Sequence, residues 1–259
     1  MKYGVIGCGN MGFAIVQALY QSTKDIQLAD PLLGQKRAEE LGLSATDNAA
    51  LAGSSDRVVL AVKPQMLEKV VEEIRPALDE KKPVIISICG GVPVKRLEAL
   101  LPGHAIIRLM PNTPVGVGKG VIMYTCNELV DEAVLEDFVQ DMRHAGIVDR
   151  VDEKLFNVGT ALSGCGPAYV YLFIEALADG AVACGLPRAK ALQYAAAMVE
   201  GSAALMLQSG KHPGELKDAV CTPGGITIMG VKALEEAGFR AAAFNAVYSA
   251  YMKDLEMSK

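Results

Sequence analysis

The first twelve residues constrain this chain more than any other stretch. The segment Tyr3–Gly12 reads YGVIGCGNMG, in which Gly7, Gly9 and Gly12 complete a G-x-G-x-x-G pattern. A short apolar run precedes the pattern and the helical apolar spacing of Phe13–Tyr20 follows it, which is the strand–turn–helix context of a dinucleotide-binding fold. There the first glycine permits the tight turn, the second lets a pyrophosphate approach, and the third permits close helix packing. The alternative is a glycine-rich turn in an ordinary α/β protein.

Composition narrows the class of protein. Of the 259 residues, 51% are hydrophobic and 21% charged, which predicts a packed globular protein. A net charge of −5 without any basic run argues against nucleic acid and anionic membranes as partners. The six cysteines lie far apart without a C-x-x-C pair, which predicts reduced thiols in the cytoplasm and no metal site. The N-terminal apolar run is interpreted as a strand, so no signal peptide is expected.

Alternating apolar runs and helical patterns predict a parallel sheet with right-handed crossovers in the first half of the chain. The expected strands after the first are Ile26–Asp30, Arg57–Pro64, Pro83–Ile88, Ala105–Met110, Gly120–Tyr124 and Ile147–Val151, and the expected helices are Leu33–Leu41, Met66–Leu78, Val94–Leu101 and about 129–143. Loops at the carboxyl ends of such strands (7–12, 62–64, 88–91 and 111–114) should line one ligand crevice.

After Val151 the β pattern ends and Ala, Leu and Met dominate. We therefore predict an α/β Rossmann-type dinucleotide-binding domain at 1–151 and an all-α substrate-binding and dimerisation domain at 152–259. The uncharged stretch 155–174 holds glycines and a proline, so we expect a loop and then a buried helix there, not a membrane span. The expected helices are Ala168–Cys184, 187–208, Ile228–Glu236 and Ala241–Glu256.

Several polar residues at the expected crevice have two interpretations. Asp30 lies 18 residues after Gly12, where an acidic residue binds the ribose of NAD and disfavours a 2′-phosphate, or it forms a turn with Pro31. Lys36 and Arg37 could instead bind that phosphate. Lys63 could meet a phosphate or be solvated, and Asn112 with Thr113 could bind the nicotinamide carboxamide or form a turn.

The stretch Lys217–Met229 is the most informative part of the second half. It contains Thr222 followed by Pro-Gly-Gly and then the start of a helix, an arrangement whose free N–H groups suit a carboxylate. From this stretch alone, a helix cap with a glycine turn is the better interpretation.

Six motifs in order give the chain its resemblance to a known family. They are Gly7–Met11 (GCGNM), Ala61–Pro64 (AVKP), Met110–Pro114 (MPNTP), Ala161–Tyr169 (ALSGCGPAY), Gly185–Arg188 (GLPR) and Cys221–Ile228 (CTPGGITI). Along its whole length the sequence resembles the pyrroline-5-carboxylate reductase family. The resemblance implies reduction of Δ1-pyrroline-5-carboxylate to L-proline with NADPH or NADH, the last step of proline biosynthesis. It also implies a homodimer built by the helix around Ala168–Cys184, which in several members assembles into a ring of dimers, a decamer.

The same resemblance implies a set of site residues. Thr227 is the expected catalytic hydroxyl, which would bond the ring nitrogen. The expected substrate-binding residues are Glu153, Thr222, Gly224, Gly225, Ile226 and Thr227. The expected cofactor-binding residues are Ile6, Gly7, Cys8, Gly9, Asn10, Met11, Asp30, Asn48, Val62, Lys63, Pro64, Ile88, Cys89, Gly90 and Asn112.

Three positions depart from the family pattern. Asp30 replaces Ser, Asn or Arg, which puts the usual preference for NADPH in doubt; Cys165 replaces a serine; Thr222 replaces a serine but keeps the hydroxyl. No histidine falls in a motif, and His104, His144 and His212 are expected at the surface. We therefore predict no histidine acid, and a proton that comes from solvent or from the protonated substrate.

Two other functions compete with this interpretation. A β-hydroxyacid dehydrogenase would carry a lysine on its interdomain helix, and Ala168–Cys184 has none. A non-catalytic NAD(P) sensor would not need the loop Thr222–Thr227.

Overall fold

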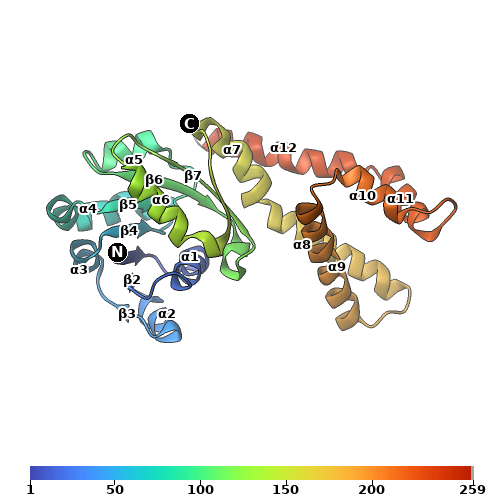
Figure 1. Cartoon of the computed structure of the whole chain (residues 1–259), viewed down its shortest axis with the longest axis horizontal. Helices are drawn as coiled ribbons and strands as arrows, with labels where there is room; N and C mark the ends of the chain where they lie inside the picture. Colours follow the sequence, from blue (N-terminus) through green and yellow to red (C-terminus); the bar gives the residue numbers. More distant parts are fainter. Residues whose placement is uncertain (258–259) are drawn as a thin grey trace. The chain divides into compact units, whose positions relative to one another are not determined.

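The structure, a computed structural model that describes residues 1–257, divides into two compact units (Figure 1). Of the described residues, the first unit contains 1–165 and 250–257, and the second contains Gly166–Ser249. The first unit therefore runs beyond residue 151, the predicted domain boundary.

An eight-stranded sheet forms the centre of the first unit, with strand order β3-β2-β1-β4-β5-β6-β7-β8. All ladders are parallel except the one between β6 and β7. The strands are β1 (Tyr3–Ile6), β2 (Ile26–Ala29), β3 (Ser44–Ala45), β4 (Arg57–Leu60), β5 (Val84–Ser87), β6 (Ile106–Pro111), β7 (Gly120–Cys126) and β8 (Gly146–Arg150). The predicted α/β class is confirmed.

The antiparallel pair β6–β7 corrects the expectation of a wholly parallel sheet. Only a short 3-10 turn, η1 (Thr113–Val117), lies between the two strands. A parallel crossover needs about a dozen residues or more, usually a helix, so this connection turns the chain back beside β6. The connection from β7 to β8 does contain a helix, and that pair is parallel.

Helices cover both faces of the sheet (Figure 1). Neighbouring residues on a buried strand point to opposite faces, so Val59 joins one core cluster and Val58 the other. The helices of this unit are α1 (Asn10–Tyr20), α2 (Gly34–Leu41), α3 (Asn48–Ser54), α4 (Pro64–Lys81), α5 (Val94–Leu100) and α6 (Glu132–Asp141), with the 3-10 turn η2 (Arg143–Ala145) before β8. The sequence patterns did not predict β3 or α3.

The stretch expected to be a loop before Ala168 is helical, so that expectation is wrong. It forms η3 (Glu153–Leu155), α7 (Phe156–Gly159) and the π-helical turn η4 (Thr160–Gly164), and it continues into α8 (Gly166–Ala183). Its glycines serve packing, because a Cβ on Gly159 would stand 2.1 Å from Met123 Sδ. By length and composition alone, the run Glu153–Ala183 could cross a membrane.

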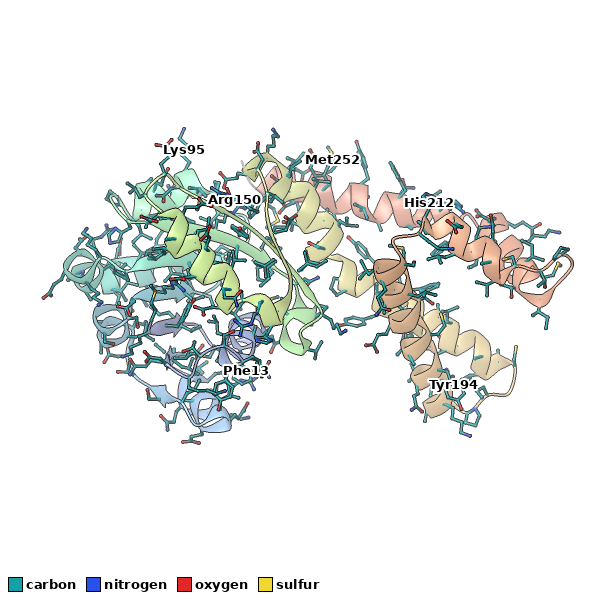
Figure 2. The ribbon with its side chains drawn as sticks, viewed as in Figure 1. Phe13, Lys95, Arg150, Tyr194, His212 and Met252 are labelled. Atoms are coloured by element: carbon teal, nitrogen blue, oxygen red, sulfur yellow. The ribbon has the colours of Figure 1, made fainter. Side chains whose placement is uncertain are left out.

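The second unit is helical, as predicted, but buries little within a single chain. Its helices are α8, α9 (Arg188–Ser209), α10 (Pro213–Val220), α11 (Ile226–Glu236) and α12 (Phe239–Met257), whose end belongs to the first unit. The expectation that α8 is buried is wrong for the single chain, in which only Ala178 of that helix is buried. Large apolar side chains such as Tyr194 stand out from these helices (Figure 2). An exposed apolar surface of this kind is typical of a protein–protein interface.

His104 also departs from expectation, because it is 3% exposed and not at the surface. Its ring nitrogens lie 3.2 Å from Pro102 O and 3.3 Å from Leu78 O. It joins the end of α4 to the turn before β6, a structural position.

A buried arginine ties the sheet to α6. Arg57 on β4 is 1% exposed and donates to Tyr3 Oη at 2.5 Å, to Asp141 Oδ2 at 2.9 Å and to Val134 O at 3.1 Å. Tyr3 donates to the same Asp141 oxygen at 2.7 Å. Burial is the main cause that raises the pKa of Tyr3 far above its ordinary value, although Arg57 acts in the opposite direction.

We expect Asp141→Ala to lower the free energy of unfolding by about 3 kcal/mol, because it leaves a buried guanidinium without its closest carboxylate. Urea unfolding at one fixed protein concentration measures the change. The matched control is Glu132→Ala, which removes the exposed pair with Arg150 and should cost less than about 1 kcal/mol. If the two variants lost equal free energies of unfolding, the buried Arg57–Asp141 pair would contribute no more to stability than the exposed Arg150–Glu132 pair.

Candidate functional site

A pocket of about 480 Å³ opens at the carboxyl ends of β1 and β4. The strand order reverses between these two strands, and ligands bind outside such a switch point in open α/β sheets. The pocket is lined by Ile6, Gly7, Gly9, Ala29, Asp30, Pro31, Leu32, Asn48, Ala61, Val62, Lys63, Met66, Lys69, Val70 and Glu73.

Seven of the predicted cofactor-binding residues meet in this pocket: Ile6, Gly7, Gly9, Asp30, Asn48, Val62 and Lys63. The other eight do not line it. Asn10 and Pro64 begin α1 and α4, Met11 follows Asn10, Cys8 and Cys89 are buried, and Ile88 and Gly90 follow β5. Asn112 follows β6 and is 8% exposed.

The glycines of the first turn fit a dinucleotide pyrophosphate. Gly7 has φ +98°, a conformation that favours glycine, and a Cβ there would lie 2.5 Å from Ala61 O. A Cβ on Gly12 would lie 2.1 Å from Gly7 O, so α1 packs directly on the turn. Gly9, in contrast, has no atom within 4 Å of its Cβ position. The N-terminus of α1 has no side-chain cap, so its N–H groups are available to an anion.

Asp30 binds the backbone of two turns. Its Oδ2 accepts from Cys8 N at 2.8 Å, and its Oδ1 accepts from the N–H groups of Leu32 and Leu33, both at 2.9 Å. Burial alone would raise the pKa of the Asp30 carboxyl, but these three amide donors together hold it below its ordinary value. The side chain is therefore an ionised carboxylate that joins the glycine turn to the start of α2. Both interpretations of this residue, turn former and neighbour of the ribose, are compatible with this geometry.

One wall of the pocket, formed by α4, was not predicted from the sequence. Met66, Lys69, Val70 and Glu73 lie three or four residues apart on α4, so they share one helical face. Asn48 Nδ2 donates to Glu73 Oε1 at 3.1 Å. The three- and four-residue spacing after Lys63 was the signal that could have found this wall. With it, the pocket is lined by two lysines, Lys63 and Lys69, and two acidic residues, Asp30 and Glu73.

The cysteines near the turn are packed and not reactive. Burial is the main cause that raises the pKa of Cys8 to about 12, and Asp30 adds to it. Burial likewise raises the pKa of Cys89, whose Sγ lies 3.4 Å from Val62 O. Neither thiol forms a thiolate near neutral pH. Among residues 1–257, no group of three or more His, Cys, Asp or Glu side chains could hold a metal ion.

Asn112 and Glu153 make structural contacts at the ends of the segment that precedes α8. Asn112 Oδ1 accepts from Val121 N at 2.9 Å, and its Nδ2 donates to Ser163 O at 3.0 Å. Glu153 Oε1 accepts from Arg108 Nη1 at 2.6 Å and from Val94 N at 2.7 Å.

In the second unit, residues 222–225 form a turn that begins α11. Gly225 N donates to Thr222 O at 3.0 Å, and Gly224 has φ +67°. A Cβ on Gly225 would lie 2.2 Å from Thr222 Oγ1, so this turn requires both glycines. α11 has no side-chain cap, and Ile226 at its first position is 94% exposed. The N–H groups that follow, up to Thr227, are available to a carboxylate.

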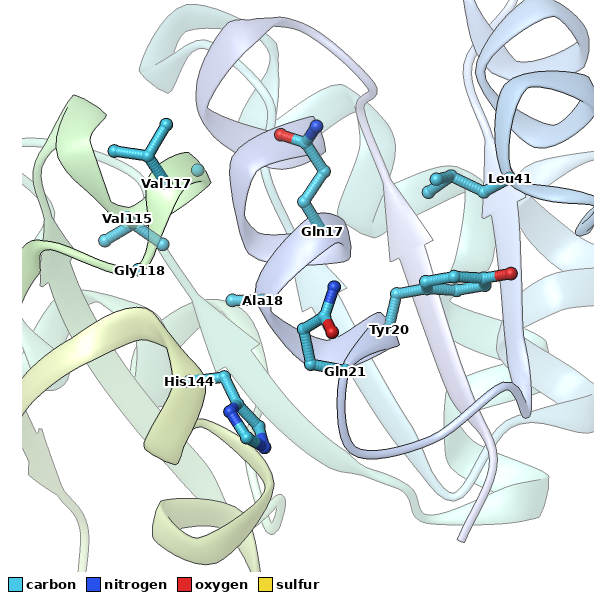
Figure 3. Close-up of a pocket in the computed structure, with 10 residues that line it drawn as sticks. Gln17, Ala18, Tyr20, Gln21, Leu41, Val115, Val117, Gly118 and His144 are labelled. Carbon is cyan, nitrogen blue, oxygen red and sulfur yellow. The ribbon is translucent and has the colours of Figure 1, made fainter.

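A second pocket of about 450 Å³ lies along the opposite end of α1 (Figure 3). Gln17, Ala18 and Gln21 line it from α1, with the turn Val115–Gly118 and His144 beside them. It shares no residue with the pocket at the switch point.

The fold and the pocket at the switch point define a dinucleotide-dependent oxidoreductase of the Rossmann type. The family model for NADP oxidoreductases, coenzyme F420-dependent, matches residues 2–91, and the model for pyrroline-5-carboxylate reductase dimerisation matches residues 153–257.

Curated relatives match the full length of the chain. It is 41% identical to the pyrroline-5-carboxylate reductase of Escherichia coli over 100% of this chain and 98% of the relative. It is 39% identical to that of Synechocystis, over 100% and 99%. The crystal structure of Plasmodium falciparum pyrroline carboxylate reductase with NADP bound matches with a TM-score of 0.90 and 34% identity, over 100% and 98%.

The chain therefore belongs to the pyrroline-5-carboxylate reductase family. It is an NAD(P)H-dependent oxidoreductase that reduces the cyclic imine Δ1-pyrroline-5-carboxylate to L-proline. Residues 153–257 form its dimerisation domain, which accounts for the apolar surface of α8 to α12.

The glycine turn predicts two opposite outcomes for alanine substitutions. Gly9→Ala should leave the free energy of unfolding within about 0.5 kcal/mol of wild type, since nothing meets its Cβ, but should weaken NADPH binding about tenfold or more by obstructing the pyrophosphate. Gly12→Ala should cost about 2 kcal/mol of stability, because its Cβ would overlap Gly7 O. Urea unfolding and calorimetric titration with NADPH separate the two effects. A Gly9→Ala variant with wild-type affinity would contradict the assignment of the pyrophosphate site.

Proposed function

We propose that the first unit binds NAD(P)H through the pocket at the switch point and that the turn 222–227 binds the imine substrate. The observation that carries the proposal is the meeting of seven predicted cofactor-binding residues in one pocket of suitable size. The family resemblance supports the remaining assignments: Cys8, Asn10, Met11, Pro64, Ile88, Cys89, Gly90 and Asn112 on the cofactor side, and Thr222, Gly224, Gly225, Ile226 and Thr227 on the substrate side.

Within the first unit, the glycine turn and the N-terminus of α1 would hold the pyrophosphate. Asp30 and Asn48 would lie by the adenosine ribose, and Lys63 by a phosphate or the second ribose. When bound, the reduced nicotinamide supplies the hydride. Both ends of the Asn112 amide are already bonded, to Ser163 O and Val121 N, so Asn112 would act on the cofactor side by ordering the loop after β6 and not by direct contact.

Within the second unit, the N–H groups of Gly224, Ile226 and Thr227 and the hydroxyl of Thr222 would bind the substrate carboxylate, while Gly225 N closes the turn on Thr222 O. The hydroxyl of Thr227 would bond the ring nitrogen and fix the orientation of the imine carbon. A protonated cyclic imine accepts hydride readily, so positioning supplies most of the rate. No histidine is assigned a role, and the proton comes from solvent or the protonated substrate.

The assembly and location follow from the same family relation. We propose a homodimer through the dimerisation domain and its further association into a decameric ring, which light scattering measures. The six free cysteines support a reducing, cytoplasmic location.

The reaction itself tests the proposal. Purified wild-type protein should oxidise NADH or NADPH when pyrroline-5-carboxylate is added. Thr227→Ala should lower kcat/KM about 30-fold, about 2 kcal/mol, by removing the hydrogen bond to the ring nitrogen. Thr227→Ser keeps the hydroxyl and is the matched control, with activity within about threefold of wild type. Near-wild-type turnover by Thr227→Ala would refute the role of this residue.

Asp30 should set the balance between the two cofactors. The carboxylate disfavours a 2′-phosphate, so Asp30→Asn should raise the ratio of kcat/KM for NADPH to that for NADH about tenfold, equivalent to about 1.4 kcal/mol. Both absolute values should fall, because asparagine has one acceptor oxygen and cannot keep both the bond to Cys8 N and the bonds to Leu32 N and Leu33 N. Asp25→Asn, at an exposed position before β2, is the control and should leave the ratio unchanged. An unchanged ratio for Asp30→Asn would make Asp30 a turn residue only.

A further inference from the structure

Glu153 connects three segments that are distant in sequence. It begins η3, at the first residue matched by the dimerisation model. Its Oε1 accepts from Arg108 Nη1 on β6 and from Val94 N at the start of α5, 45 and 59 residues away in sequence. Its side chain is 35% exposed, and the two hydrogen bonds hold the carboxylate between the strand and the helix.

The bond to Val94 supplies α5 with an acceptor that its own sequence lacks. The residue before the helix is Pro93, which makes no side-chain cap, and the first turn of α5 has no acidic residue. Val94 itself is 8% exposed. Its N–H would lose its partner without Glu153, and a buried unpaired donor is costly. α5 directly follows the loop 88–92 at the carboxyl end of β5, so Glu153 fixes one end of that loop.

Arg108 holds Glu153 in place. It is 8% exposed in the middle of β6, and its Cζ lies 4.4 Å from the centre of the Phe156 ring. Phe156 is 1% exposed, so the guanidinium is enclosed by the sheet on one side and α7 on the other. A buried guanidinium needs a carboxylate, and the Glu153 Oε1 contact of 2.6 Å provides it.

The other end of the same segment is attached to the same strand. Asn112, just after β6, donates to Ser163 O in the π-helical turn η4. A Cβ on Gly164 would lie 2.7 Å from Met110 Cε, so the turn packs closely on β6 between these polar contacts. Residues 153–165 are therefore fixed to β6 at both ends, and Glu153 extends the attachment to α5.

We propose that Glu153 and Arg108 are positioning residues that hold the loop 88–92 in the shape that binds the nicotinamide half of the cofactor. This inference rests on the proposed function, which assigns Ile88, Cys89 and Gly90 to the cofactor. It gives Glu153 a role through Val94 and Arg108 and not through contact with the imine. Loss of either residue releases the start of α5 and with it the loop.

Cofactor binding in the absence of substrate separates this role from a substrate contact. Calorimetric titration with NADPH should show affinity about tenfold weaker for Glu153→Ala, which removes the acceptor of both bonds, and for Arg108→Met. Steady-state kinetics should show KM for NADPH raised in parallel. KM for the imine should change by less than about twofold. Because the two residues act as a unit, the double variant should be no weaker than the more severe single variant.

Two further variants make the result specific. Arg108→Lys keeps a cation near Glu153 and should recover part of the affinity. Lys154→Gln removes the exposed neighbour that pairs with Asp152 and should bind NADPH as wild type does. Thermal unfolding of each variant monitors the fold.

Unchanged NADPH affinity with a raised KM for the imine would overturn the inference and assign Glu153 to the substrate. Lower stability with unchanged NADPH affinity would overturn it as well and leave a purely structural role. A wild-type protein that binds neither NADPH nor NADH would instead refute the proposed function, a result recognisable before any variant is made.

Discussion

The close approach of three backbone segments at the first glycine turn governs the organisation of the N-terminal unit. Gly12 stands against Gly7 O, and Gly7 stands against Ala61 O, at distances that leave no space for a Cβ. This packing places the N-terminus of α1 at the junction of β1 and β4, where the strand order reverses. The junction creates the pocket, and the same glycines that allow the packing leave N–H groups available to an anion. One steric requirement therefore determines both the helix-on-sheet geometry and the location of the ligand.

Charge then refines what this turn can bind. The Asp30 carboxylate orders the turn through Cys8 N and the start of α2 through Leu32 and Leu33. Those amide bonds keep it ionised, so the group that shapes the turn also brings a negative charge to the wall of the pocket. The pocket opposes it with Lys63 and Lys69. In this chain the preference between NADH and NADPH is therefore coupled to the order of the glycine turn. A substitution at Asp30 is expected to change both.

The sequence predicted the regular parts of the fold and failed where local pattern and packing diverge. Apolar runs located the strands of the sheet apart from β3, which with α3 is too short for a periodic signal. The glycines at 159 and 164 suggested a loop, but both lie inside helical turns. Their missing Cβ atoms leave space for the side chains of Met123 and Met110. On the cofactor side, motif residues such as Gly9 and Lys63 were predictable, since the fingerprint and the strand ends identify them. Lys69 and Glu73 were missed because a lysine and a glutamate on a helix also suit a solvated face.

The helical unit shows why amphipathic pattern could not predict burial there. Apolar residues surround α8 almost completely, a pattern typical of a helix covered on every side, yet the chain itself buries only Ala178 of that helix. A dimerisation domain resolves the conflict, because a second copy covers what the first leaves open. The turn 222–227 lies in this same unit, between α10 and α11, neither of which has a buried residue in the single chain. We therefore expect subunit association to stabilise the helices on both sides of the proposed substrate turn, so that the measured stability of this half depends on protein concentration.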